Sequence, residues 1–217
     1  EIRAGLSAGP DEVSWVLTAA LIAEVIMIPL SGWLSQLFST RWLFTICSIG
    51  FMLASVACAS AWSIESMIVF RACQGFCGGA IAPMVFATIF SAFPARYQNV
   101  LSAIVSLLGT GAVALGPSLG GWISETLSWE WLFLFNVPFS VLATVLVGSL
   151  VDFDKPQWHL FKRIDIVGIL LLATFFISLL IVLEEGRRED WFASDMIVAF
   201  SVVTVVTGIC LFWHELT

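Results

Sequence analysis

The chain has 217 residues, of which 59% belong to the hydrophobic set AVILMFWYC and only 12% are charged, and its mean hydropathy is +1.00. Soluble domains contain roughly 25% charged residues, and a soluble fold of this size could not hide so much apolar surface from water. The net charge of -7 gives no basic surface for nucleic acid. Composition therefore excludes a soluble enzyme, a nucleic-acid binder and a disordered chain, and indicates an integral membrane protein.

Seven apolar segments follow one another with short loops between them. Each is close to the roughly 20 residues that cross a bilayer as a helix, and none has the strict alternation of an outer-membrane strand. The sequence therefore predicts an all-α integral membrane protein. Because residue 1 is Glu and not Met, we expect the chain to be cropped at its start. The segments are 13–37, 42–60, 64–92, 98–123, 131–151, 164–183 and 195–213.

Basic residues in the loops predict the orientation. Cytoplasmic loops of membrane proteins carry an excess of Lys and Arg, and alternate loops here differ in their basic residues, five against three. We therefore expect a multi-pass protein of the inner (plasma) membrane, with the five-residue set in the cytoplasm. This set is Arg41, Arg96, Lys155, Lys162 and Arg163, and the opposite set is Arg3, Arg187 and Arg188.

Two charged residues interrupt the apolar segments. Glu24 lies near the centre of 13–37, ~16 Å deep at 1.5 Å per residue, and Arg71 lies one or two turns inside 64–92. A charge at the centre of a bilayer costs at least ~2.5–3.5 kcal/mol on insertion scales, and burial favours the neutral form of a carboxyl group. Glu24 is thus either a proton-coupling group or a neutral structural residue, and Arg71 either a functional cation or a clamp between helices.

Small residues cluster in two segments. Gly75 and Gly79 form a G-x-x-x-G pattern, and Gly116-Pro117-x-x-Gly120-Gly121 combines small residues with a proline. Small residues at this spacing let two helix backbones approach closely, and an internal proline kinks a helix. We predict that Gly120 and Gly121 lie against a neighbouring helix with no room for a side chain.

Three segments together resemble signatures of the major facilitator superfamily, in the same order along the chain. The first, 32–41, is similar to the family's loop between helices two and three, although Gln36 replaces a common Asp and Ser39 a common Gly. The resemblance implies a gating loop at Gly32 and Arg41, proton coupling or substrate binding by Glu24, Arg71 and Gln74, and an antiporter hinge. The other two segments are Arg71-Ala72-Cys73-Gln74-Gly75 and Gly116-Pro117-Ser118-Leu119-Gly120-Gly121.

Two further helices follow Asp152, where twelve-helix members place a long loop. This arrangement resembles the fourteen-helix drug:proton antiporters of the EmrB/QacA type. The resemblance implies a fragment with helices two to eight. Residues 1–152 would form an N-terminal transporter bundle without its first helix, and residues 153–217 two linker helices.

The resemblance implies proton-coupled efflux of drugs or other lipophilic compounds, by rocking of two bundles around a midplane site. The expected partners are a lipophilic or cationic substrate, protons and the lipid bilayer; whether a periplasmic adaptor and an outer-membrane channel join them stays open. We expect no metal site and no enzymatic activity, because His159 and His214 are far apart and no H-E-x-x-H occurs. We also expect no cofactor, and no nucleic-acid partner because the net charge is negative. The alternatives are a carrier of another solute, such as a siderophore or metabolite, and a seven-helix receptor.

Overall fold

The computed structural model describes residues 10–151, 156–159 and 165–216, with side chains from residue 13 onward. The predicted all-α architecture is confirmed, since seven helices in the described part are long and apolar enough to cross a membrane. In chain order the elements are α2 (Pro10–Phe38), α3 (Thr40–Ala59), α4 (Ile64–Gly78), α5 (Ile81–Ala92), α6 (Ala95–Thr126), α7 (Trp131–Leu134), α8 (Asn136–Leu150), α9 (Ile166–Glu185), the 3-10 turn η2 (Trp191–Ala193) and α10 (Asp195–Leu216).

Two of the predicted segments are interrupted in the structure. The segment 64–92 divides into α4 and α5 around Gly79, and the segment 131–151 divides into α7 and α8 at Phe135. A proline follows each break by a few residues: Pro83 lies four residues after Gly79, and Pro138 lies four residues after Leu134. Proline lacks the N–H that would bond to the carbonyl four residues earlier, and its ring clashes with that carbonyl. Each pair of helices still makes one span.

One residue, Ser39, separates α2 from α3. Its φ of 76° lies in the left-handed region, and its hydroxyl oxygen accepts a hydrogen bond from the Trp42 N–H as the N-cap of α3. The connection between the predicted segments 13–37 and 42–60 is therefore shorter than expected, because Thr40 and Arg41 already belong to the helix. The positive φ gives a physical reason why a glycine is common at this position in similar sequences.

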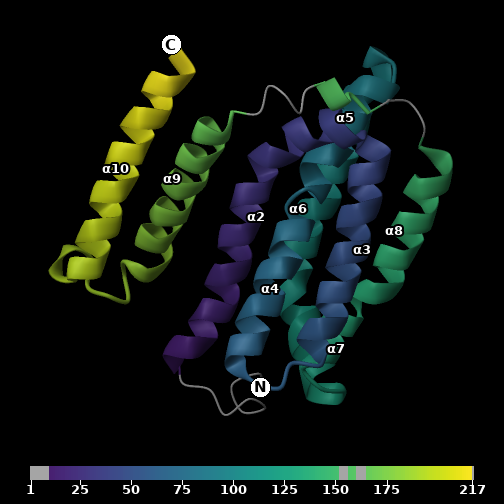
Figure 1. Ribbon diagram of the computed structural model, residues 1–217. Coiled ribbons are helices and arrows are strands. Elements are labelled where there is room, and N and C mark those ends of the chain that lie inside the picture. Colours follow the sequence, from purple (N-terminus) through teal and green to yellow (C-terminus); the bar gives the residue numbers. More distant parts are fainter. Residues whose placement is uncertain (1–9, 152–155, 160–164, 217) are drawn as a thin grey trace.

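The helices pack in the arrangement of Figure 1, with α2, α3 and α4 at the centre. The hairpin of α9 and α10 lies on one side of the bundle next to α2, and α8 lies on the other side next to α3. Arg41 and Arg96 begin α3 and α6 at one end, and Arg187 and Arg188 lie at the opposite end. The described members of the two sets thus lie at opposite ends of the bundle, and which end faces the cytoplasm stays a prediction; Arg3, Lys155, Lys162 and Arg163 lie outside the described residues.

Two apolar clusters form the core of the bundle, one toward each end. Between these clusters along the helices lie Glu24 of α2 and Arg71 and Gln74 of α4. The first cluster contains Val16, Cys58, Ile64, Met67 and Phe133. The second cluster contains Met27, Leu43, Phe44, Cys47, Ala80 and Met84.

Candidate functional site

A cavity of about 380 Å³ opens between α2, α4 and α5, between the two apolar clusters. It is lined by Glu24 from α2 and by Arg71 and Gln74 from α4, with Phe51 of α3 adding an aromatic wall. The structure therefore brings together the three residues that the sequence predicted for proton coupling or substrate binding. They meet because α2 and α4, which are separated in the chain by α3, are neighbours in the bundle.

The close approach of α2 and α4 depends on glycine. A Cβ atom built on Gly75 would collide with the carbonyl oxygen of Ala20, and one on Gly79 would lie 2.5 Å from the carbonyl oxygen of Glu24. Real Cβ atoms do not approach backbone this closely, so no side chain fits at either position. The G-x-x-x-G pattern is thus a close-packed helix interface, as predicted. It sets the distance between the helix that carries Glu24 and the helix that carries Arg71.

A short hydrogen-bonded chain holds the guanidinium of Arg71 in place. Arg71 Nη1 donates to Gln74 Oε1 at 2.7 Å, and Gln74 Nε2 donates to Ser55 Oγ at 2.7 Å. The Ser55 hydroxyl in turn donates to the carbonyl oxygen of Phe51 at 2.8 Å. Gln74 is 3% exposed and Ser55 is fully buried, so both have left water and depend on these bonds. Arg71 also lies over the Phe133 ring, 5.7 Å from its centroid.

Glu24 and Arg71 face the same cavity without neutralising each other. Among the described residues, no ion pair joins the carboxylate of Glu24 to the guanidinium of Arg71. The side chain of Glu24 is exposed, whereas Arg71 is half-buried. The carboxylate is therefore accessible to a proton or to a cation that enters the cavity. No group of three His, Cys, Asp or Glu side chains that could hold a metal ion occurs in the described part of the chain.

The residues predicted for the gating loop lie at the junction of α2 and α3. Gly32 is still inside α2, where its carbonyl oxygen accepts hydrogen bonds from the Ser35 hydroxyl at 2.9 Å and from the Gln36 amide at 3.4 Å. Arg41 is in the first turn of α3, with its guanidinium 5.9 Å from the centroid of the Trp42 ring. Both are well separated along the helices from the cavity residues, and their gating role stays a prediction.

The predicted packing of the glycine-rich run in α6 is wrong within the described residues. A Cβ atom at Gly116 or Gly121 would meet nothing within 4 Å, and one at Gly120 would make an ordinary contact of 3.8 Å with a side-chain methyl of Leu132. No residue of α6 is buried. The helix runs on without a break through Pro117. The small residues thus form an open face, and the role of Gly116, Pro117, Gly120 and Gly121 as a hinge stays a prediction.

Sequence reasoning missed two groups of polar residues. Ser55 is the anchor of the Arg71 chain, and nothing in its apolar surroundings distinguishes it from other helical serines. Glu185 lies beyond the predicted segment 164–183, where a loop is expected, but it is the last residue of α9 and only 4% exposed. A signal for its burial was present, because Ser178, Ile181 and Glu185 follow the spacing of one helix face and all three are buried.

Comparison with known families identifies the fold. The family model of the Major Facilitator Superfamily matches residues 1–215. The chain belongs to this superfamily. The seven apolar helices of its described residues and its relatives make it a multi-pass protein of the inner membrane. The superfamily is a class of transporters and not of enzymes.

Curated relatives of EmrB type confirm the narrower resemblance. The chain is 37% identical to the "Colistin resistance protein EmrB" of Acinetobacter baumannii and 33% identical to the "Multidrug export protein EmrB" of Escherichia coli K12, in both cases over 100% of this chain and 42% of the relative. It is 30% identical to the "Fatty acid resistance protein FarB" of Neisseria gonorrhoeae, over 94% of this chain and 40% of the relative. The chain thus spans less than half the length of these superfamily members.

Proposed function

We propose that this protein exports drugs or other lipophilic compounds across the inner membrane in exchange for protons, by alternating access. The observation that carries the proposal is the cavity in which Glu24 faces Arg71 and Gln74 between two apolar layers of the bundle. Membership of the superfamily and the names of the EmrB relatives support it. Those names mention colistin, multiple drugs and fatty acids, so we assign a lipophilic class of substrate and no individual compound.

In this proposal Glu24 is the group for which proton and substrate compete. Its carboxylate lines a largely apolar cavity, where an acid is costly unless it is protonated or paired with a cation. Loading of a proton would therefore favour release of a cationic substrate from the same carboxylate, and the reverse. Arg71, held by Gln74 and Ser55, would keep a fixed positive charge beside this exchange. Exchange at one carboxylate requires no second coupling site.

The remaining parts of the proposal concern the wider transporter. Residues 1–152 would belong to one rocking bundle and residues 153–217 would form two linker helices. The open glycine-rich face of α6 would act as the hinge of the antiporter, and Gly32 and Arg41 as part of a gate. The chain would have no enzymatic activity of its own. A periplasmic adaptor and an outer-membrane channel are partners that membrane-fraction pull-downs with the full-length protein would test.

The decisive variant is Glu24→Gln, which keeps the shape of the side chain and removes its titration. In proteoliposomes that contain the full-length protein, we expect it to abolish the proton release that follows addition of a cationic drug. Folding and membrane insertion should change little, because the side chain is exposed to the cavity.

Glu65→Gln is the matched control. Glu65 is an exposed acid in the first turn of α4, at the end of the same bundle, so its removal changes the net charge by the same amount and should leave exchange unchanged. If Glu24→Gln exchanges drug for protons at the wild-type rate and stoichiometry, the carboxylate is a structural group and the proposed mechanism is wrong.

A further inference from the structure

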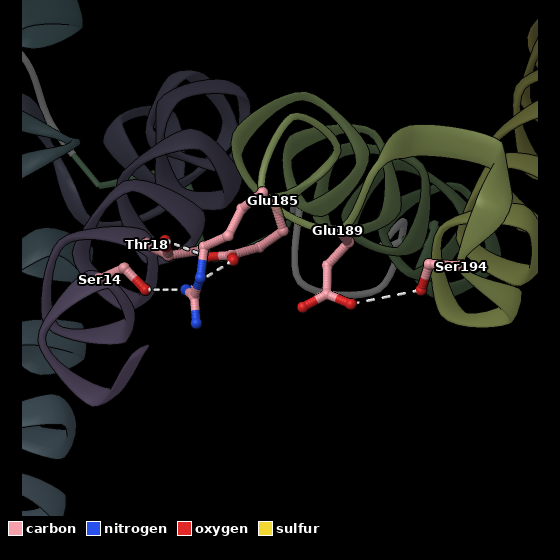
Figure 2. Close-up of polar contacts among 6 residues, drawn as sticks. Ser14, Thr18, Glu185, Glu189 and Ser194 are labelled. Carbon is pink, nitrogen blue, oxygen red and sulfur yellow. Dashed lines mark hydrogen bonds and ion pairs between the residues drawn. The ribbon is translucent and has the colours of Figure 1, made fainter. Parts of the chain in front are cut away.

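An ion pair at the loop between α9 and α10 contacts α2 near the beginning of that helix (Figure 2). Arg188 Nη1 lies 2.9 Å from Glu185 Oε2 and also donates a hydrogen bond to the hydroxyl of Ser14. The hydroxyl of Thr18 points at the other oxygen of Glu185, at 3.5 Å, which is the outer limit for a hydrogen bond. Ser14 and Thr18 are one turn apart on α2, so the pair contacts a single face of that helix.

Burial makes this contact specific. The side chain of Glu185 is 5% exposed and that of Arg188 is 33% exposed. A carboxylate so far removed from water must be paired and hydrogen-bonded, since an unpaired buried charge is strongly destabilising. Thr18 is 2% exposed and Ser14 is half-buried, so the face of α2 that receives the pair is closed to solvent at Thr18 and partly open at Ser14.

The backbone of the loop after α9 holds Arg188 in position. The N–H of Arg188 donates to the carbonyl oxygen of Glu185 at 3.0 Å, and the N–H of Trp191 donates to the carbonyl oxygen of Gly186 at 2.7 Å. A Cβ atom at Gly186 would lie 2.8 Å from the Trp191 ring, so the loop folds tightly over a glycine. The guanidinium is therefore presented to α2 by a compact turn and not by a long flexible loop.

The hairpin behind this contact is joined along its length. Thr204 of α10 donates to the hydroxyl of Ser178 of α9 at 2.9 Å, at mid-membrane. At the far end, His214 Nε2 lies 2.6 Å from Asp165 Oδ2. Asp165 also accepts the Gly168 N–H as the N-cap of α9, and these two interactions lower the pKa of Asp165. A contact between α9 and α2 therefore couples both linker helices to α2.

Helix α2 is thus held from two directions. Thr18 faces the hairpin, whereas the backbone at Ala20 and Glu24 touches the glycines of α4. Thr18 and Glu24 are six residues apart, which at 3.6 residues per turn places their side chains about 120° apart around the helix axis. Any rotation of α2 away from the hairpin would therefore turn Glu24 relative to its cavity.

The geometry points to Glu185 and Arg188 as positioning residues, which fix the rotation of α2 and thereby the direction in which Glu24 faces the cavity. The linker hairpin is on this view part of the exchange machinery and not a passive connection. The inference rests on the proposed function only in that Glu24 is taken as the coupling carboxylate. The contact between the hairpin and α2 can be tested without transport.

The first readout is structural. Leu21 lines the cavity together with Glu24, so in a background without the native cysteines the alkylation rate of Leu21→Cys reports how α2 is rotated. We expect Glu185→Gln to change this rate several-fold. Glu189→Gln is the matched control, because the Glu189 carboxylate accepts from the Ser194 hydroxyl at 3.4 Å inside the hairpin, away from α2 (Figure 2). Its alkylation rate should equal that of the parent.

The second readout is the drug:proton exchange of the full-length protein in proteoliposomes. Glu185→Gln should lower kcat and shift the pH of half-maximal exchange, while Glu189→Gln leaves both unchanged. The double variant Glu185→Arg with Arg188→Glu restores the pair with reversed charges, because an arginine can donate to Thr18 and a glutamate can accept from Ser14. It should recover the parental alkylation rate and pH profile, which neither single variant does.

The outcomes separate this inference from the proposed function. An unchanged alkylation rate in Glu185→Gln, with normal insertion, overturns the inference whatever transport does. A changed alkylation rate with an unchanged pH profile of exchange overturns the link to Glu24. If Glu24→Gln itself leaves exchange intact, the proposed function fails and the alkylation result still decides the contact. Should Glu185→Gln not accumulate, Ser14→Ala removes only the hydroxyl on α2 and is read in the same way.

Discussion

The two glycine motifs of this chain have opposite surroundings. Gly75 and Gly79 of α4 lie so close to the backbone of α2 that a Cβ atom would collide with carbonyl oxygens, whereas Gly116 and Gly121 of α6 face open space. The first motif is the less specific of the two as a sequence pattern. The second is the one that most closely resembles a family signature. The motif that identifies the family is therefore not the motif that forms a close-packed helix contact within this chain.

The difference follows from what each pattern needs. A G-x-x-x-G pair closes against any smooth helix that the bundle brings alongside, and α2 offers Ala20 at the required level. The α6 run offers the same smooth surface, but among the described residues only a side-chain methyl of Leu132 in α7 comes within 4 Å of a Cβ atom built on it, at Gly120. Small residues make the close approach of two helix backbones possible, and the arrangement of the helices decides where such an approach occurs.

The largest expected effect is that of Gly75→Ala. Its new Cβ would meet the carbonyl oxygen of Ala20, and backbone cannot give way as a flexible side chain can. Overpacking of this kind typically costs ~1–3 kcal/mol, so the midpoint of thermal unfolding of the detergent-solubilised full-length protein should fall clearly. Tryptophan fluorescence measures it. A midpoint equal to wild type would mean that α2 and α4 are not in close contact.

We expect Gly121→Ala to shift the midpoint of thermal unfolding in the opposite direction, toward higher temperature. Space is open around this residue, and alanine is favoured over glycine in a helix by roughly 0.8–1 kcal/mol. The unfolding midpoint should therefore rise slightly in the same assay. A fall as large as that of Gly75→Ala would show that the α6 face is covered in the full-length protein, and the comparison between the two motifs would then be lost.

Gly208→Ala should change the unfolding midpoint least of the three variants. It represents a contact of intermediate tightness, between those at Gly75 and Gly121. A Cβ atom here would lie 3.0 Å from Cε2 and 3.3 Å from Cδ2 of Phe175 across the α9–α10 hairpin. A small tilt of the ring relieves this contact, and the gain in helix propensity offsets what remains. The midpoint should move by less than in either other variant. A strong decrease would show that the Phe175 ring is as rigid as backbone.

Much of the fold could be predicted from the sequence, because hydrophobic length is sufficient to define a membrane span. The spans of α2 and α3 agree with prediction within a few residues, and Glu24 and Arg71 were found by being charged where lipid is expected. The breaks near Gly79 and Phe135 were missed, because a proline alone does not locate a break: α2 continues through Pro29 and α6 through Pro117.

The partners of the site could not be predicted. The bond of Gln74 to Ser55 and the contact of the Glu185–Arg188 pair with α2 depend on which helices are neighbours, and hydrophobicity does not encode this. Glu185 illustrates the point, because an acid at a predicted loop edge is usually solvated, yet here it is buried against Thr18. The family signature in α6 was informative about ancestry and uninformative about contacts in the described chain.

The single-residue junction at Ser39 has a mechanical consequence. One residue lies between α2 and α3, so the chain has only two soft torsions at this corner. In Ser39 the φ torsion is positive, and the Ser39 hydroxyl caps α3 in this conformation. The orientations of α2 and α3 should therefore be coupled to each other. We therefore expect a tilt of α2, for example when its cavity is occupied, to be passed on to α3, because few torsions at this corner can absorb it.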